Sequence, residues 1–154
     1  MKTINLLILS YFKPKTFEGL QDKTIYEKIG IKIYKKYLPT TGDMMRRWRK
    51  IKQINIGKTD KIEELYKYER KTRNYEWRHI IGAISLIVLA SFLDRKLTLF
   101  DYIFLTLLNL YINIYPIFLQ RYNRIRIIKV LKNCGHPDPY NLISLNNTNR
   151  HEIV

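Results

Sequence analysis

The feature that most constrains this chain is a stretch at residues 79–119 that carries almost no charge. Residues 80–93 form an uncharged run of 14 residues, and residues 97–119 form a second run whose only charged residue is Asp101. A helix over the second run would be about 34 Å long and would cross a hydrocarbon core of ~30 Å, whereas the first run reaches only about 21 Å. We therefore predict a transmembrane helix in the second run. The first run either spans with local thinning of the bilayer or dips part way and returns.

Basic residues are concentrated on both sides of this stretch. The 154 residues include 28 Lys and Arg against 13 Asp and Glu, a formal net charge of +15. Residues 1–78 hold 20 basic and 9 acidic residues, residues 79–119 hold two of each, and residues 120–154 hold six and two, so the excess is +11, 0 and +4. Because Lys and Arg beside membrane spans stay in the cytoplasm, both flanks are predicted to be cytoplasmic, with the turn at Asp94 outside.

These patterns predict an all-α membrane protein in which a two-helix transmembrane hairpin is extended by cytosolic amphipathic helices. We expect a multi-pass protein of the cell membrane with both its N- and C-termini in the cytoplasm. Along the chain, we predict a short apolar N-terminal anchor (1–12), a basic cytosolic helical region (13–78), the hairpin (79–119), a basic juxtamembrane helix (120–135) and a flexible tail (136–154).

Two other classes of protein compete with this interpretation. A large basic excess suits a nucleic-acid binder, but here the charge is divided by an apolar stretch, so we expect no nucleic-acid partner. Apolar runs of 10–14 residues also occur as core helices of soluble bundles, and this alternative stays open. A single cysteine, Cys134, excludes an internal disulfide framework and a multi-cysteine zinc site. No metal or cofactor is predicted.

The basic region contains two amphipathic patterns. Residues 23–37 place Ile25, Ile29 and Ile33 at four-residue spacing, which predicts one helix with these side chains on its apolar face. Residues 43–52 predict a second, strongly basic helix with Trp and Met on its apolar side, a composition that suits an anionic membrane surface. For either helix, a solvated basic face over a small core is the alternative.

The membrane segments are predicted to continue into the cytosol as helices. A third helix begins after Gly57, with Asp60 and Glu63 at capping-box spacing, and meets no breaker before the first apolar run. The second apolar run likewise continues as an amphipathic helix until Gly135, a typical helix terminator. The two arms of the hairpin are therefore expected to be long rods.

Polar side chains at the cytoplasmic end of both arms form the candidate site. Arg73, Glu76 and His79 are three residues apart and share one face of a helix. In a hairpin, Gln120, Arg121, Tyr122, Asn123 and Arg124 return at the same depth. A further polar line lies on one side of the second helix and consists of Asn109, Asn113, Pro116 and Gln120. Because an amide side chain exposed to lipid costs free energy, this line should face the first helix or a ligand head group.

These residue types can support acid–base chemistry. A histidine beside a glutamate can take the proton from a hydroxyl nucleophile, while the carboxylate orients the ring. The arginines could hold an anionic donor or stabilise a developing oxyanion. The alternative is structural: His79 anchors the helix at the interface, and the amide line holds two helices together.

Several motifs in these segments carry a family resemblance. They are Tyr26-Glu27-Lys28 followed by Gly30-Ile31-Lys32 and Leu38-Pro39, then Glu76-x-x-His79, and Asn113 followed by Gln120-Arg121-Tyr122-Asn123-Arg124 and Arg126. With these residues the chain, from Phe17 to about Asn133, resembles the glycosyl-4,4'-diaponeurosporenoate acyltransferase family of small membrane proteins. The resemblance implies transfer of a fatty acyl group to a sugar hydroxyl of a glycosylated lipid or carotenoid at the cytoplasmic membrane.

From this resemblance and the polar pattern we assign candidate roles. His79 and Glu76 are the predicted catalytic residues, and the predicted substrate-binding residues are Arg73, Asn109, Asn113, Gln120, Arg121, Tyr122, Asn123 and Arg124. Because no Ser or Cys nucleophile stands in a recognisable setting, the acyl group would move directly, with His79 as the base. The expected partners are membrane lipids, a fatty acyl donor and a glycosylated acceptor, and a homo-oligomer is one option. The alternative function is a non-catalytic membrane protein that binds a lipid head group or a partner subunit.

Overall fold

The computed structural model describes residues 9–19, 24–37, 62–92 and 97–141. All regular elements in these ranges are helices, which confirms the predicted all-α class for the described part of the chain. Besides helical residues at 9–12 and 139–141, they are, in chain order, η1 (Thr16–Glu18), α2 (Ile25–Lys28), α3 (Ile31–Tyr37), α5 (Ile62–Phe92), α6 (Leu99–Asn109), the π-helix η3 (Leu110–Ile114) and α7 (Tyr115–Asn133).

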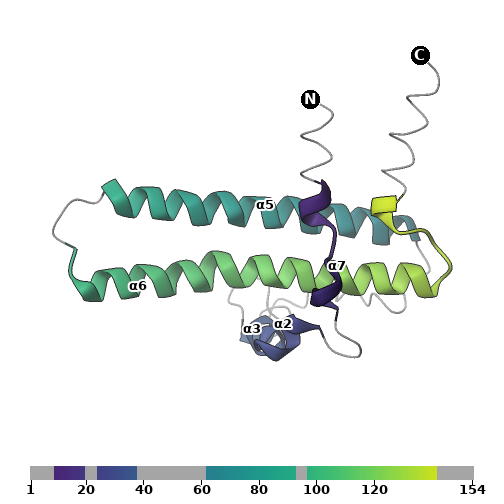
Figure 1. Cartoon of the computed structure of the whole chain (residues 1–154), viewed down its shortest axis with the longest axis horizontal. Helices are drawn as coiled ribbons and strands as arrows, with labels where there is room; N and C mark the ends of the chain where they lie inside the picture. The colour runs from purple at the N-terminus through teal and green to yellow at the C-terminus, as the bar shows by residue number, and fades with distance from the viewer. Residues whose placement is uncertain (1–8, 20–23, 38–61, 93–96, 142–154) are drawn as a thin grey trace, which may run out of the picture.

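Two long rods lie side by side and dominate the molecule (Figure 1). One is α5, which runs without a break for 31 residues and confirms the predicted continuity of the cytosolic and apolar segments. The other consists of α6, η3 and α7 in line, and it runs antiparallel to α5. The buried residues of α5 recur at spacings of four, three, four and seven, the heptad-like pattern of two packed helices: Leu65, Glu69, Thr72, Glu76 and Ala83. We call this line of contact the helix seam.

The second rod has clear local signals at its ends and at its centre. The Thr98 side chain accepts a hydrogen bond from the Asp101 backbone N–H at the start of α6, in a capping box. Near the middle, Pro116 has no N–H to donate and its ring crowds the preceding turn, and the wider π-helix η3 lies just before it. At the other end, Gly135 adopts a positive φ of 75° and the His136 N–H donates to the Leu131 carbonyl, so the predicted terminator is confirmed.

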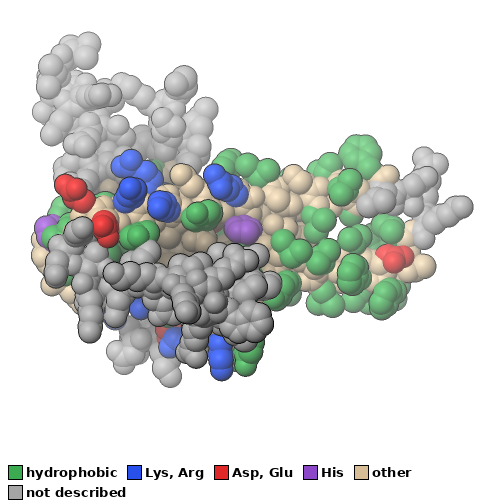
Figure 2. Space-filling view, turned by 180° about the vertical axis from the view of Figure 1, so that it is seen from behind, with side chains coloured by type: hydrophobic (Ala, Val, Ile, Leu, Met, Phe, Trp, Pro, Cys, Tyr) green, Lys and Arg blue, Asp and Glu red, His purple; other side chains and the backbone are tan. Residues whose placement is uncertain are grey.

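The second rod is long and apolar enough to cross a membrane. This test, by length and composition alone, is met by residues Leu99–Asn133, and only 17% of the apolar window is buried inside the structure, whereas the core helix of a soluble protein is mostly buried. Among the described helices α5 does not meet the test, so a crossing by the first arm is not established. Hydrophobic side chains nevertheless cover the end of the hairpin where α5 leads to α6, while Lys and Arg gather over the other half (Figure 2).

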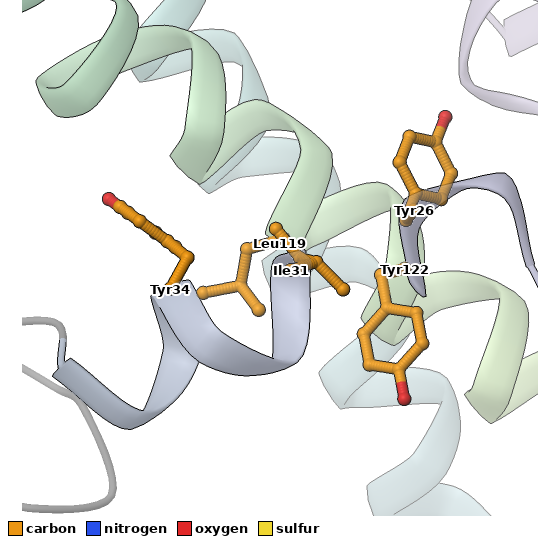
Figure 3. Packing of buried hydrophobic residues seen from close by; sticks show 5 residues of the cluster. All are labelled: Tyr26, Ile31, Tyr34, Leu119 and Tyr122. Atoms are coloured by element: carbon orange, nitrogen blue, oxygen red, sulfur yellow. The ribbon is translucent and has the colours of Figure 1, made fainter. Parts of the chain in front are cut away.

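The predicted single helix over residues 23–37 is wrong. Gly30 has a φ of +82° and separates α2 from α3, because this left-handed conformation cannot continue a right-handed helix. The break rotates the apolar face: Ile31 and Tyr34 are buried, whereas Ile33, which was predicted to share one apolar face with Ile25 and Ile29, is 67% exposed. Ile31 lies against Leu119 of α7, in a cluster that also holds Tyr26, Tyr34 and Tyr122 (Figure 3).

Short segments at both ends of the described chain also pack on the hairpin. Phe12 and Tyr140 are buried together against Ile128 of α7. The first part of the expected flexible tail, residues 136–141, is thus held in place, and the Tyr66 hydroxyl donates to the Pro137 carbonyl at 2.8 Å. The rest of the tail, residues 1–8 of the predicted anchor, the predicted helix at 43–52, the predicted helix start after Gly57 and the turn at Asp94 lie outside the described residues.

Candidate functional site

Glu76 stands at the centre of the candidate site, fully buried on the helix seam. Its Oε1 accepts a hydrogen bond from the Arg121 Nε at 2.9 Å, and its Oε2 accepts one from the Arg124 Nη2 at 2.5 Å. Burying a carboxylate away from water costs free energy unless charged hydrogen-bond donors pair with it. Helix length and turn position predicted that residue 76 would lie beside residues 120–124, and this prediction is confirmed. The contact consists of two ion pairs.

Both arginines use their remaining donors on other segments of the chain. Arg121 pairs with Glu18 of η1 through Nη1 and donates from Nη2 to the Tyr11 carbonyl at 2.6 Å. Arg124 donates from Nε to the Thr72 hydroxyl at 3.2 Å and from Nη1 to the Phe12 carbonyl at 2.9 Å. Every guanidinium nitrogen of the two residues thus has a protein acceptor. The arginines tie the N-terminal segment to both arms of the hairpin.

A second carboxylate, Glu69, extends the cluster by two turns along α5. Its Oε2 lies 3.2 Å from the Arg73 Nη2, and its Oε1 accepts a hydrogen bond of 2.7 Å from the Tyr140 hydroxyl. We call the resulting set the ion-pair network: Glu18, Glu69, Glu76, Arg73, Arg121 and Arg124. Its three acids and three bases balance in charge.

The sequence interpretation missed three members of this cluster. Glu69 lies one heptad before Glu76, so the 4-3 spacing of the seam was a usable signal for it. Glu18 and Tyr140 approach from segments distant in sequence. Glu18 is buried and accepts a hydrogen bond of 3.0 Å from the Tyr26 hydroxyl. It also pairs with Arg121, which lies 103 positions further along the chain, and local sequence patterns do not predict a contact over that separation.

Burial shifts the pKa of the groups around the network. Burial raises the pKa of the Tyr140 phenol well above its usual value; the nearby Arg124 opposes this shift and the charge of Glu69 adds to it. The pKa of Tyr26 is likewise raised by burial and by the charge of Glu18. Both phenols therefore stay protonated at physiological pH and act as neutral donors to carboxylates.

His79 lies one turn beyond Glu76 on α5 and is only half buried. Among the described residues its side chain has no hydrogen-bond or ion-pair partner, and the expected pairing with Glu76 is not present because both Glu76 oxygens face arginines. On one side of His79 the helices are joined by the Glu76 ion pairs. On the other side, the next turn of α5 meets Asn109 and Asn113. His79 lies three residues after Glu76 and four before Ala83, so it continues the heptad-like spacing of the seam.

The predicted amide line does face α5. The Asn109 Nδ2 donates to the Ala83 carbonyl at 3.4 Å, and the Asn113 Nδ2 donates to the Asn109 Oδ1 at 2.8 Å. A side chain at Gly82 would put its Cβ 2.7 Å from the Asn113 Oδ1, so the helices approach closely here. These contacts are those of helix–helix association in a membrane, and whether either amide binds substrate stays a prediction.

The other predicted substrate-binding residues differ in their surroundings. Tyr122 is buried in the α3–α7 cluster and its hydroxyl donates to the Glu27 Oε1 at 3.0 Å. Gln120 and Asn123 are half buried, and no side-chain partner occurs for either within the described ranges. Gln120 is the last member of the predicted polar line and directly precedes Arg121, which contacts Glu76.

Two of the open pockets beside the described helices adjoin the second rod. The first, of about 280 Å³, lies between α5 and α6 and is lined by Leu86, Ile87, Ala90, Ser91, Tyr102, Leu105, Thr106 and Asn109. It lies on the same side of α5 as the seam, two turns beyond His79, and we call it the inter-helix pocket. The second, of about 460 Å³, lies on the opposite side of the second rod and is lined by Ile29, Gly30, Ile33, Tyr34, Leu107, Leu110, Tyr111 and Tyr115. We call it the α3 groove.

The fold and the site together define an all-helical hairpin protein with a membrane-length apolar helix and a buried ion-pair network at one end of it. In a comparison with known protein families, the family model of glycosyl-4,4'-diaponeurosporenoate acyltransferase matches residues 9–133. The chain therefore belongs to this family. The matched range includes the ion-pair residues of both arms and of η1. Searches of curated proteins and of solved structures found no significant match.

Proposed function

We propose that this protein is a membrane acyltransferase that transfers a fatty acyl group to a hydroxyl of a glycosylated lipid or carotenoid. Family membership supports the reaction class. The position of His79 is the observation that carries the mechanism. It is a half-buried imidazole without a protein partner in the described ranges, and along α5 it lies between the ion-pair network and the inter-helix pocket.

In the proposed reaction, the His79 imidazole takes the proton of the acceptor's sugar hydroxyl. The hydroxyl oxygen forms a bond to the acyl carbonyl carbon, and the bond between that carbon and the donor's leaving group breaks. The leaving group then receives the proton from the imidazolium, so His79 returns to its neutral state. The Gln120 side-chain amide is our candidate donor to the oxyanion that forms on the carbonyl oxygen.

The ion-pair network has a positioning role in this proposal. Glu76 does not orient the imidazole directly, since Arg121 and Arg124 occupy its carboxylate. It fixes the register of α5 against α7 and thereby the distance between His79 and Gln120. Arg73, which pairs with Glu69, belongs to the same scaffold. The inter-helix pocket is open and is lined by both apolar and polar side chains, and in this proposal it would receive the acyl chain from the side of the bilayer.

The same proposal includes a place and an orientation in the cell. Both basic flanks lie in the cytoplasm, with the N- and C-termini, and the hairpin enters the membrane from that side as two spans. The separation of exposed hydrophobic side chains from Lys and Arg along the hairpin supports this placement (Figure 2). His79 and the glycosylated acceptor then meet at the cytoplasmic interface.

The test compares lipid extracts of cells with and without the protein by mass spectrometry. We expect a new acylated glycolipid that disappears with His79→Ala and persists with the matched control His136→Ala, because His136 lies beyond the end of α7 and away from the seam. Membrane fractionation checks that both variants insert. Unchanged product with His79→Ala would contradict the assignment of the base.

A second candidate function is a non-catalytic membrane protein that binds a lipid head group or a partner subunit. The complete mutual satisfaction of Glu76, Arg121 and Arg124 favours it, since such a network also serves stability alone. If the inserted wild-type protein yields no acylated product from any supplied glycolipid, and copurifies with a defined lipid, this alternative replaces the enzyme.

A further inference from the structure

The orientation of α3 differs from that of the long helices. In Figure 1 the rods run across the picture, whereas α3 is seen almost end-on, so its axis points across the direction of the hairpin. The hairpin enters the bilayer along the membrane normal in the proposed placement. On that basis, α3 lies parallel to the plane of the membrane.

The side chains of α3 divide into three faces. Ile31 and Tyr34 are buried against α7. Ile33 and Tyr37 are 67% and 56% exposed although they are large and apolar. Lys32 and Lys36 are exposed on a different side. At roughly 100° per residue, the lysine pair is rotated by about 100° from the Ile33 and Tyr37 pair.

The apolar face of α3 is continuous with the exposed apolar surface of α6. Ile33 lines the α3 groove together with Leu107 and Leu110, so it points toward the membrane half of the second rod. The Tyr34 hydroxyl, which also borders the groove, donates to the Tyr111 carbonyl at 3.0 Å. The groove therefore offers carbon surface, and its lining contains no charged residue. Such a surface beside a membrane segment suits acyl chains.

We propose that α3 is an interfacial helix that binds an anionic membrane surface. It lies in the plane of the bilayer with Ile33 and Tyr37 among the acyl chains and with Lys32 and Lys36 at the lipid phosphates. Lys32, whose Nζ is 3.1 Å from the Glu27 Oε1, keeps its charged end on the cytosolic side of the helix. The cytoplasmic boundary of the hydrocarbon then lies near Tyr111, where the Tyr34 hydroxyl contacts the second rod.

Site-directed spin labelling measures this depth directly. The single cysteine is removed by Cys134→Ser, and one cysteine at a time is introduced by Ile33→Cys, Tyr37→Cys, Lys32→Cys or Lys36→Cys, with Leu107→Cys as the hydrocarbon reference. The full chain is reconstituted in vesicles of phosphatidylcholine and phosphatidylglycerol. Collisions of each label with oxygen, which is enriched in acyl chains, are compared with collisions with a water-soluble nickel complex.

We expect labels at Ile33 and Tyr37 to favour oxygen and labels at Lys32 and Lys36 to favour the nickel complex. Equal nickel accessibility at all four positions, with Leu107 protected, would overturn the interfacial helix and leave the membrane placement intact. Nickel accessibility at Leu107 as well would contradict the membrane placement on which the inference rests. Because Ile33 and Lys36 are both exposed, their substitution leaves the buried face of α3 unchanged.

Discussion

At the scale of single residues, Glu76 determines how the ends of the hairpin are joined. Its carboxylate has no access to water and depends wholly on Arg121 and Arg124, which in turn hold the backbone of Tyr11 and Phe12. A buried pair of this kind adds little net stability over an apolar contact, but loss of one partner leaves the other charged and unsatisfied. The network therefore enforces one arrangement of the segments.

We predict that Glu76→Gln destabilises the protein strongly. The amide keeps the shape of the carboxylate but removes its charge. Arg121 then has only Glu18 as a counter-ion, and Arg124 has only Glu69, whose Oε1 is 3.7 Å from its Nε, so we expect a cost of about 3–5 kcal/mol. The unfolding midpoint in detergent should fall. The matched control Glu63→Gln, at an exposed position in the first turn of α5, should change stability by less than about 0.5 kcal/mol. Equal midpoints for both variants would mean that the network is not a determinant of stability.

At the scale of elements, α3 owes its position to one backbone conformation. Gly30 at φ +82° turns the chain between α2 and α3, and Ile31 and Tyr34 then reach the surface of α7. The Tyr115 hydroxyl donates to the Ile29 carbonyl at 3.4 Å and holds the turn from the other side. Without this turn, a continuous helix would keep Ile25, Ile29 and Ile33 on one face, as the four-residue spacing predicts.

Gly30→Ala should therefore weaken the docking of α3. There is open space around a Cβ at this position, so the cost comes from the left-handed backbone alone, about 1–2 kcal/mol. Gly19→Ala is a matched control, since its Cβ also meets no atom within 4 Å and its φ is −114°. Limited proteolysis between residues 24 and 37 should be faster for Gly30→Ala. Equal cleavage of both variants would show that the turn does not depend on the glycine.

At the scale of the whole molecule, the exposed apolar band is shorter than the sequence implies. On the second rod, the large exposed hydrophobic residues end at Ile112, because α3 covers the following turns. From Leu99 to Ile112 the band is about 21 Å long. On α5 it is about 18 Å long from Ile81 to Phe92, against ~30 Å of hydrocarbon, and the exposed Tyr75 and Trp77 lie on the other side of the exposed Arg78. Two complete spans then require a thinned bilayer, which costs a fraction of a kcal/mol for each Å of mismatch.

Exposure of the turn between α5 and α6 should accordingly depend on bilayer thickness. In a Cys134→Ser background, Leu97→Cys is treated with an impermeant maleimide present on both sides of phosphatidylcholine vesicles. Labelling should be extensive with short acyl chains and should fall with long ones. The wild-type protein, whose single Cys134 is exposed at the end of α7, is labelled separately as the control and should react equally in both kinds of vesicle. Labelling of Leu97→Cys that is independent of chain length would contradict the mismatch.

The sequence by itself determined the helical class, the two rods and the ends of the second one. It could do so because apolar run length, capping residues and a terminal glycine act within a few turns of the chain. Only the tertiary structure decided which partners Glu76 has, that Glu18 and Tyr140 join it, and that Ile33 lies outside the core. A buried carboxylate takes the nearest charged donors in space, and these come from segments up to 103 positions apart in the case of Glu18 and Arg121. The left-handed turn at Gly30 likewise rotates an amphipathic face in a way that periodicity along one helix does not reveal.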